Sequence, residues 1–261
     1  MTITCMFCAE DEPKSHLEDV FPIWLCKKLA YYAQQAHPGT QAVYENYTYT
    51  KLDEFKRDFV ESERHPETGE LVGARPTAYL LPNVCAECNN GWMGRLEGAV
   101  KLLLSGLLEG RSKKLAPYDQ QILATWALKT ALTYDAAREP RHIPSDLGTN
   151  PFYRRGLSLS SSQVAIGWDP DHEPQGDLAH GRFLFPKPAE ASVSDNSILV
   201  VCFQFNAVLI RVLINFSSGV DKSEPFKTDL PAEPPYWHEI WPSGPRFNWP
   251  STESRKSRFM N

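Results

Sequence analysis

Apolar residues recur at helical spacing in three segments of the chain. The first segment covers 24–35, where Leu25 and Leu29 share one face of a predicted helix. A second amphipathic helix is predicted over 92–108 and ends before a glycine. A third is predicted over 116–140, with one proline near its start and another at its end. These segments predict a substantial helical component.

Elsewhere the chain alternates between apolar and polar residues or carries short apolar runs, which favours strands. Turn signals lie at Thr68-Gly69 and at Asn206. The Pro- and Trp-rich segment 233–251 predicts an ordered but irregular tail or one final short strand. The strand-like segments are 44–52, 161–169, 181–188 and 196–216.

Together these elements predict an α+β fold with a boundary at about 110–145, because the chain changes from helical to strand-rich after Pro144. The first predicted unit is residues 1–110, with an insertion at about 36–80. The second is residues 111–261, a helical join followed by an α+β domain that is rich in strands.

The composition is ordinary for a globular protein, with 42% hydrophobic and 23% charged residues. A net charge of -5 argues against a broadly basic nucleic-acid coat, although a small basic face can sit on an acidic body. Polar residues interrupt the longest apolar stretch, 198–214, so no membrane partner is expected. The N-terminal residues have no secretory signal pattern, and the cysteine usage fits a reducing compartment, so we expect a cytoplasmic protein.

Two CxxC pairs, Cys5/Cys8 and Cys85/Cys88, carry the clearest chemical signal. Each pair can place two thiolates on adjacent corners of a tetrahedron, and both together supply the four-thiolate shell of a structural Zn²⁺ site. The alternatives are four unrelated cysteines or a redox CxxC, and neither pair opens a helix in a βαβ pattern. A closed four-cysteine site supports a fold and does no chemistry itself. The long gap between the pairs requires a folded insertion.

Polar residues stand beside both pairs. Glu18 begins the run Glu-Asp-Val-Phe-Pro, which ends at Pro22, while Asn83 precedes the second pair and Asn89 follows it. This arrangement resembles that of zinc-stabilised HNH (ββα-metal) endonucleases. The resemblance implies an N-terminal treble-clef-like module in which a β-hairpin and a helix hold one catalytic divalent ion, with the four-cysteine zinc site clamping the hairpin to the helix. Further along the chain, the Trp-x-x-x-Leu-Glu run that begins at Trp92, the WALKTA helix and the IWP…WP segment resemble a group of bacterial HNH proteins.

The resemblance implies roles for these residues. Glu18 and Asn89 take the positions of the ligands of a catalytic Mg²⁺ or Mn²⁺ ion. Asn83 takes the position of the middle Asn, which orients the loop that carries the general base. The implied reaction is hydrolysis of DNA phosphodiester bonds, with the metal ion stabilising the charge that develops on the phosphate. No nucleic-acid-binding residues are identified by the motif.

One position departs from the family pattern. The family has a general-base His immediately after the acidic residue, and this chain has Asp19 there. Imidazole suits the role because its reference pKa is about 6.5, whereas that of Asp is about 3.9. Asp19 is therefore a natural variant in an active enzyme, a substitution that silences the nuclease, or the mark of a relative that only binds. His16 is an unfavourable substitute, since an odd offset on a strand puts it on the face opposite Asp19.

Each candidate also has a structural interpretation. Glu18 and Asp19 suit a solvated acidic pair at a strand end, and Asn83 and Asn89 suit turns and helix caps. We expect Asn89 in particular to cap the helix over 92–108. Lys129 lies inside an apolar helix, where the favoured prediction is that it snorkels to the surface rather than facing nucleic acid. Small basic clusters such as Lys113-Lys114 suit phosphate contacts or ordinary solvated surface.

Three functions follow from the sequence. The first is a metal-dependent HNH-type endonuclease that acts on DNA in a bacterial defence or mobile-element context. The second is an inactive HNH-like zinc module that binds nucleic acid or a partner protein. The third is a nuclease subunit that needs a protein partner or a second copy of itself, which the net acidity favours over a free-standing DNA-cutting enzyme.

Overall fold

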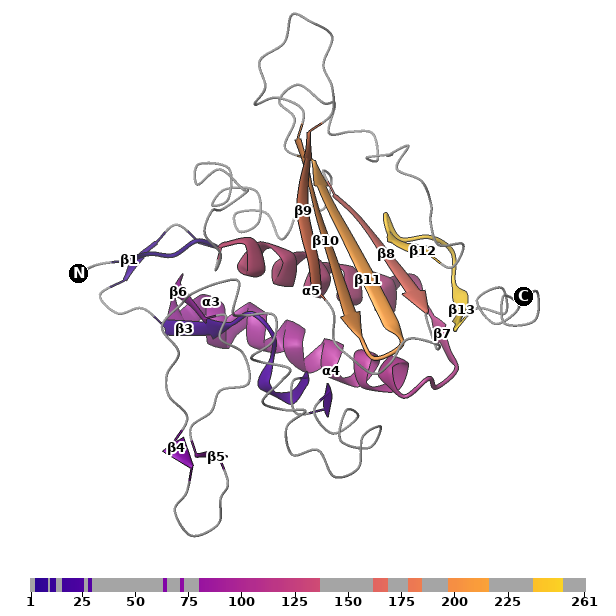
Figure 1. Ribbon diagram of the computed structural model, residues 1–261, viewed down its shortest axis with the longest axis horizontal. Coiled ribbons are helices and arrows are strands. Elements are labelled where there is room, and N and C mark those ends of the chain that lie inside the picture. The colour runs from indigo at the N-terminus through magenta and orange to yellow at the C-terminus, as the bar shows by residue number, and fades with distance from the viewer. Residues whose placement is uncertain are drawn as a thin grey trace, which may run out of the picture.

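The computed structural model describes residues 3–8, 10–12, 16–25, 28–29, 63–64, 71–72, 80–136, 162–168, 178–184, 197–215 and 237–250. Within these ranges, one long helix packs against a five-stranded antiparallel sheet, a second long helix packs against the first, and several short strand pairs are added around them (Figure 1). The predicted mixture of helices and strands is therefore confirmed, while the ββα-metal module and the domain boundary stay predictions.

The sheet has the strand order β12-β8-β11-β10-β9, and every neighbouring pair is antiparallel. Side chains alternate between its two faces, so that Val164, Val201 and Ile210 belong to the buried core. The hairpin between β10 and β11 turns at Asn206, whose φ of 54° lies in the left-handed region that Asn tolerates. The strands are β8 (Ser162–Trp168), β9 (Leu178–Leu184), β10 (Ser197–Phe205), β11 (Val208–Asn215) and β12 (His238–Trp241).

The predicted strands over 161–169 and 196–216 are confirmed as β8 and as the β10–β11 hairpin. The strand predicted over 181–188 begins earlier than expected, at Leu178, because Leu178 pairs with Phe203 at the far end of β10. Residues 185–188 lie outside the described residues.

Two helices lie on one side of this sheet: α5 packs against the sheet, and α4 packs against α5. Helix α4 (Gly94–Leu108) confirms the second predicted helix, and α5 (Pro117–Ala136) confirms the third as far as the described residues extend. From Trp126 to Asp135, every residue of α5 is buried, so this half of the helix is enclosed on all sides. None of the helices in the described ranges combines the length and the apolar character needed to cross a bilayer.

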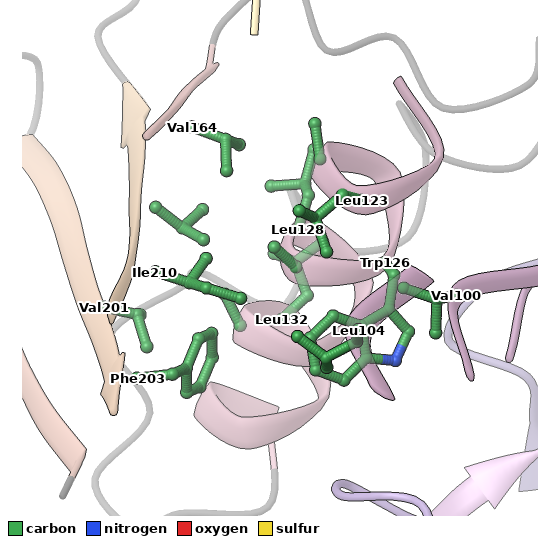
Figure 2. Close-up of a cluster of buried hydrophobic side chains, with 14 of the residues drawn as sticks. Val100, Leu104, Leu123, Trp126, Leu128, Leu132, Val164, Val201, Phe203 and Ile210 are labelled. Carbon is green, nitrogen blue, oxygen red and sulfur yellow. The ribbon is translucent and has the colours of Figure 1, made fainter. Parts of the chain in front are cut away.

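The core fills the space between α5 and the sheet and continues to α4. Figure 2 shows Leu128 and Leu132 of α5 facing Ile210 and Phe203 of the sheet, while Trp126 lies on the other side of α5. There, the Trp126 ring lies beside Leu104 and Val100 of α4 (Figure 2). Because Trp126 is fully buried, it supplies a large apolar contact between the two helices.

The prediction that Lys129 snorkels to the surface is wrong. Its side chain is 0% exposed, and its Nζ lies 3.1 Å from Oε1 of Glu97 on α4, whose side chain is 25% exposed. Since α5 is enclosed on all sides at this point, the ammonium group has no path to bulk water. It ion-pairs with the neighbouring helix instead.

The C-terminal end of α4 is joined to the sheet by two contacts. Gly110 has a φ of +66°, and a Cβ there would meet the Trp168 ring at 3.1 Å, so both conformation and close approach require glycine. The side-chain amide of Asn206 donates to the carbonyl of Leu108 at 3.0 Å. This bond satisfies one of the carbonyls that a helix end leaves without a partner.

The Pro- and Trp-rich segment forms two short strands, where the sequence predicted an irregular tail or a single strand. Strand β12 extends the sheet beside β8, and β13 (Phe247–Trp249) pairs with β7 (Lys113–Leu115) just before α5. Buried Gln120 holds the intervening turn: its amide donates to the carbonyls of Leu115 (3.2 Å) and Pro245 (3.0 Å), and its Oε1 accepts from the Gly244 N–H at 3.0 Å.

Short elements make up the described N-terminal part. Residues 23–25 and 28–29 are helical, in agreement with the predicted helix over 24–35, and the rest of that helix lies outside the described residues, as does the strand predicted over 44–52. The Thr68-Gly69 turn also lies outside them, between two strands that pair with each other. The short elements are β1 (Ile3–Thr4), β2 (Asp11–Glu12), β3 (His16–Asp19), β4 (Glu63–Arg64), β5 (Leu71–Val72), β6 (Leu80–Val84), α3 (Ala86–Cys88) and the π-helical turn η1 (Asn89–Met93).

Candidate metal centre

The first cysteine pair lies in the tight connection between β1 and β2. The backbone N–H of Cys5 donates to the carbonyl of Glu10 at 2.9 Å, which closes the loop around the pair. Within the pair, Phe7 is 1% exposed, and its ring meets that of Trp92 edge-on with the centroids 5.4 Å apart. Since Trp92 follows the second pair, this aromatic contact holds the two loops together.

The second pair opens a helix. Cys85 has extended backbone angles, and its Sγ accepts the N–H of Cys88 at 3.3 Å, so the thiol acts as the N-cap of α3. The expectation that Asn89 caps the helix over 92–108 is wrong, because helical structure begins at Ala86 and passes through η1 into α4. Gly91 departs from helical angles and marks a kink in this helical run.

The four sulfur atoms converge. The Sγ atoms of Cys5, Cys8, Cys85 and Cys88 all lie within 4.8 Å of one another, and those of Cys8 and Cys85 are 3.5 Å apart. A tetrahedral zinc ion with Zn–S bonds of about 2.3 Å requires sulfur separations of about 3.8 Å. All four residues are buried as free cysteines. The four cysteines therefore converge as the spacing predicted, in a candidate metal-binding site whose geometry is compatible with structural zinc.

The surroundings of the thiols differ. Burial would raise the pKa of Cys5, but backbone N–H donors, among them that of Cys85 at 3.3 Å, leave it below its ordinary value. Burial raises the pKa of Cys8 to about 12, and that of Cys88 also rises, again chiefly because of burial. Without metal, these two groups are therefore protonated thiols near neutral pH, and metal binding must displace their protons.

A buried indole N–H beside the cluster is also consistent with metal binding by the cysteines. The Nε1 of Trp92 has no hydrogen-bond partner of good geometry among the described atoms, yet it lies close enough to the Cys88 sulfur to lower the pKa of that thiol. A metal-bound thiolate is a better acceptor than a thiol, so metal binding would give this donor a partner. Apart from the proximity of Cys88 and Trp92 along the chain, no sequence pattern indicates this contact.

The candidate catalytic residues lie on the strand pair next to the cluster. Strand β3 ends at Asp19 and pairs antiparallel with β6, with Glu18 opposite Leu81 and Asp19 opposite Leu80. Asn83 lies on β6 between Leu81 and the second cysteine pair, where the pairing register of β3 with β6 shifts. For Glu18, Asp19 and Asn83, the backbone positions alone are described.

This ladder brings the strands of the candidate residues side by side but does not put Asn83 opposite Asp19. About three residues along β6 separate Asn83 from Leu80, the partner of Asp19, which corresponds to roughly 10 Å. Asn89, half-buried, follows Cys88 directly at the start of η1. The roles assigned to these residues stay predictions.

The segment after Asp19 is anchored on the sheet. Val20 is 0% exposed, and the Phe21 ring contacts those of Tyr134, Phe203 and Phe205, with centroid distances of 6.4, 5.8 and 5.9 Å. These distances fall within the range of favourable aromatic pairs. The sheet and α5 therefore fix where the end of β3 lies. The sequence did not single out Phe21, because its partners lie more than a hundred residues away or on another element.

No protein-family model, curated protein or solved structure matches this chain.

Proposed function

We propose that the N-terminal part of the chain is a zinc-stabilised nuclease module of the HNH type, acting on DNA. The four-cysteine cluster is the observation that carries the proposal, since it joins an antiparallel strand pair to the start of a long helix. In such an arrangement, structural zinc stabilises the fold, and a second site beside it does the chemistry. Glu18 and Asp19 lie on β3, which pairs with β6, the strand that leads into Cys85, and Asn89 directly follows Cys88.

The structural zinc is tested first, by metal analysis of the purified protein. We expect one zinc ion per chain, and its loss in a Cys85→Ser variant, because serine does not replace a thiolate ligand. Cys202→Ser is the matched control, since Cys202 lies on β10, in the sheet, and should leave the zinc content unchanged. Full zinc content in Cys85→Ser would refute the four-thiolate site.

The proposed chemistry is hydrolysis of a phosphodiester bond. Glu18 and Asn89 would hold a Mg²⁺ or Mn²⁺ ion, which would supply Lewis-acid stabilisation of the charge that develops on the phosphate. Asp19 accepts a proton from water as the water oxygen forms its bond to phosphorus and the ester P–O bond breaks. Asn83 orients the end of β3.

The identity of the residue at position 19 determines the expected rate of DNA cleavage. A carboxylate with an ordinary pKa of about 3.9 is a weaker base than imidazole, so Asp19→His should raise metal-dependent nicking of supercoiled plasmid. Cleavage by the chain as it stands identifies an active enzyme, and cleavage by Asp19→His alone identifies a silenced one. If neither protein nicks while zinc remains bound, the nuclease proposal fails.

The alternative is a zinc module without catalysis, which binds nucleic acid or a partner protein. The observation that favours it is the carboxylate at the position where an imidazole base is expected. It predicts nucleic-acid or protein binding that is unaffected by Asp19→His and no metal-dependent cleavage by either protein.

A further inference from the structure

A short basic ribbon lies at the opposite end of α4 from the cysteine cluster (Figure 1). It consists of β7 and β13, paired antiparallel with Lys114 opposite Asn248, together with the residues that lead into each strand. Both members of this pair are exposed, whereas Leu115 and Trp249 are buried beneath the ribbon. The cations of the ribbon are Arg111, Lys113, Lys114 and Arg246.

Two of these cations have acidic neighbours, and two do not. Arg111 pairs with Glu109, and Nζ of Lys113 lies 3.8 Å from Oδ1 of Asp119. Lys114 and Arg246 are exposed, and neither forms an ion pair with another residue in the described part of the chain. The ribbon therefore presents a net positive surface to solvent.

Positive charge is concentrated in the residues that form and flank the basic ribbon. Residues 109–119 and 244–250 carry four of the 27 Lys and Arg residues but two of the 32 Asp and Glu residues. The remainder of the chain is correspondingly more acidic than the net charge of -5. A basic patch on an acidic body is the electrostatic footprint of a phosphate-binding surface.

An exposed aromatic residue stands beside these cations. Tyr118, in the first turn of α5, is 72% exposed and directly precedes Asp119, the partner of Lys113. An exposed ring next to cations is suited to stack on an unpaired base while the cations contact phosphates.

We propose that the basic ribbon binds the phosphate backbone of nucleic acid. For the identity of its ligand, the proposal rests on the nuclease function proposed above. The 15 residues of α4 span about 22 Å between ribbon and cysteine cluster, which is roughly six to seven base steps of duplex DNA. A duplex held on the ribbon can therefore extend along α4 to the end of the molecule that carries β3.

The test is fluorescence anisotropy with a labelled duplex long enough to span α4 and the ribbon, at several salt concentrations and without added divalent metal. Lys114→Glu with Arg246→Glu should weaken binding on the order of tenfold and reduce the salt dependence by about two phosphate contacts. Lys114→Gln with Arg246→Gln should show a smaller loss in the same direction, which guards against misfolding of the double reversal.

Lys101→Glu on α4 makes the same change of charge at an exposed lysine outside the ribbon. A duplex that extends along α4 should lose some affinity from it, but less than from Lys114→Glu. The proposal requires a clearly larger loss for Lys114→Glu. It is overturned if the two variants bind alike, or if the chain binds no duplex. Tyr118→Ala should weaken the binding of a single strand more than that of the duplex.

The two proposals fail separately. Ribbon-dependent binding without any metal-dependent cleavage would overturn the nuclease proposal and leave the ribbon proposal standing. Metal-dependent nicking with binding that ignores Lys114 and Arg246 would overturn the ribbon proposal alone.

Discussion

Replacement of Phe21 by alanine removes the contact that fixes the end of β3 on the sheet. The ring lies 5.8 Å from Phe203 and 5.9 Å from Phe205, both at nearly perpendicular angles, and 6.4 Å from Tyr134. Each such pair contributes roughly 0.5–1.5 kcal/mol beyond its buried area, and the three share one ring, so their contributions do not simply add.

The expected loss follows from these contacts and from the burial of the ring. A fully buried Phe→Ala change costs about 3–5 kcal/mol, and Phe21 is only half-buried. We therefore expect Phe21→Ala to lower the free energy of unfolding by about 2–3 kcal/mol, and Phe21→Leu by about 1 kcal/mol, since leucine keeps most of the apolar contact. If β3 carries the catalytic carboxylates, nicking should also fall while zinc stays bound.

The assay is equilibrium unfolding in urea with the zinc content measured in parallel. Ile23→Ala is the control, because this residue lies on the same segment but is 42% exposed, and its loss should stay within about 0.5 kcal/mol. Equal losses for Phe21→Ala and Ile23→Ala would refute the view that the sheet anchors this segment.

Three further predictions concern other parts of the molecule. Asn206→Gly should lower the free energy of unfolding by about 1 kcal/mol through loss of the hydrogen bond to Leu108. Asn206→Ala should lower it by about 1 kcal/mol more, since of these two replacements only glycine tolerates the left-handed turn; equal losses in thermal unfolding would contradict this. Glu97→Gln should lower the free energy of unfolding in urea more than Lys129→Met does, because it removes the carboxylate that faces a fully buried ammonium group, whereas Lys129→Met removes the buried charge itself. The reverse order would refute the burial argument. Apparent zinc affinity, measured by chelator competition, should rise at least about 100-fold per pH unit near neutrality, since the pKa of Cys8 is raised to about 12 and that of Cys88 also rises; a slope clearly below two protons per zinc would contradict it.

Local patterns predicted much of the secondary structure. Pro117 starts α5, and the helical spacing of apolar residues placed α4 and α5 correctly. The turn at Asn206 was predictable because Asn is a common turn residue, and it tolerates the left-handed backbone that the structure shows there. The four cysteines were also predictable, since a CxxC spacing fixes two ligands at once and two such pairs complete one shell.

Features that depend on distant contacts could not be predicted. The start of the helix at Ala86 was missed because a cysteine caps it, and cysteine is outside the usual set of capping residues. The burial of Lys129 depends on Glu97, which is 32 positions away and on another helix. Likewise, the pairing of β13 with β7 joins segments more than a hundred residues apart, so no local pattern reveals it.

The nuclease proposal is tested most directly by a comparison of Asp19→His with Asp19→His/Glu18→Ala. Both proteins are loaded with zinc, and the nicking of supercoiled plasmid is measured with Mg²⁺ or Mn²⁺ and without either. We predict metal-dependent nicking by Asp19→His and its loss in the double variant at equal zinc content, because Glu18 holds the catalytic ion. Nicking by neither protein, or by both at the same rate, would contradict the account.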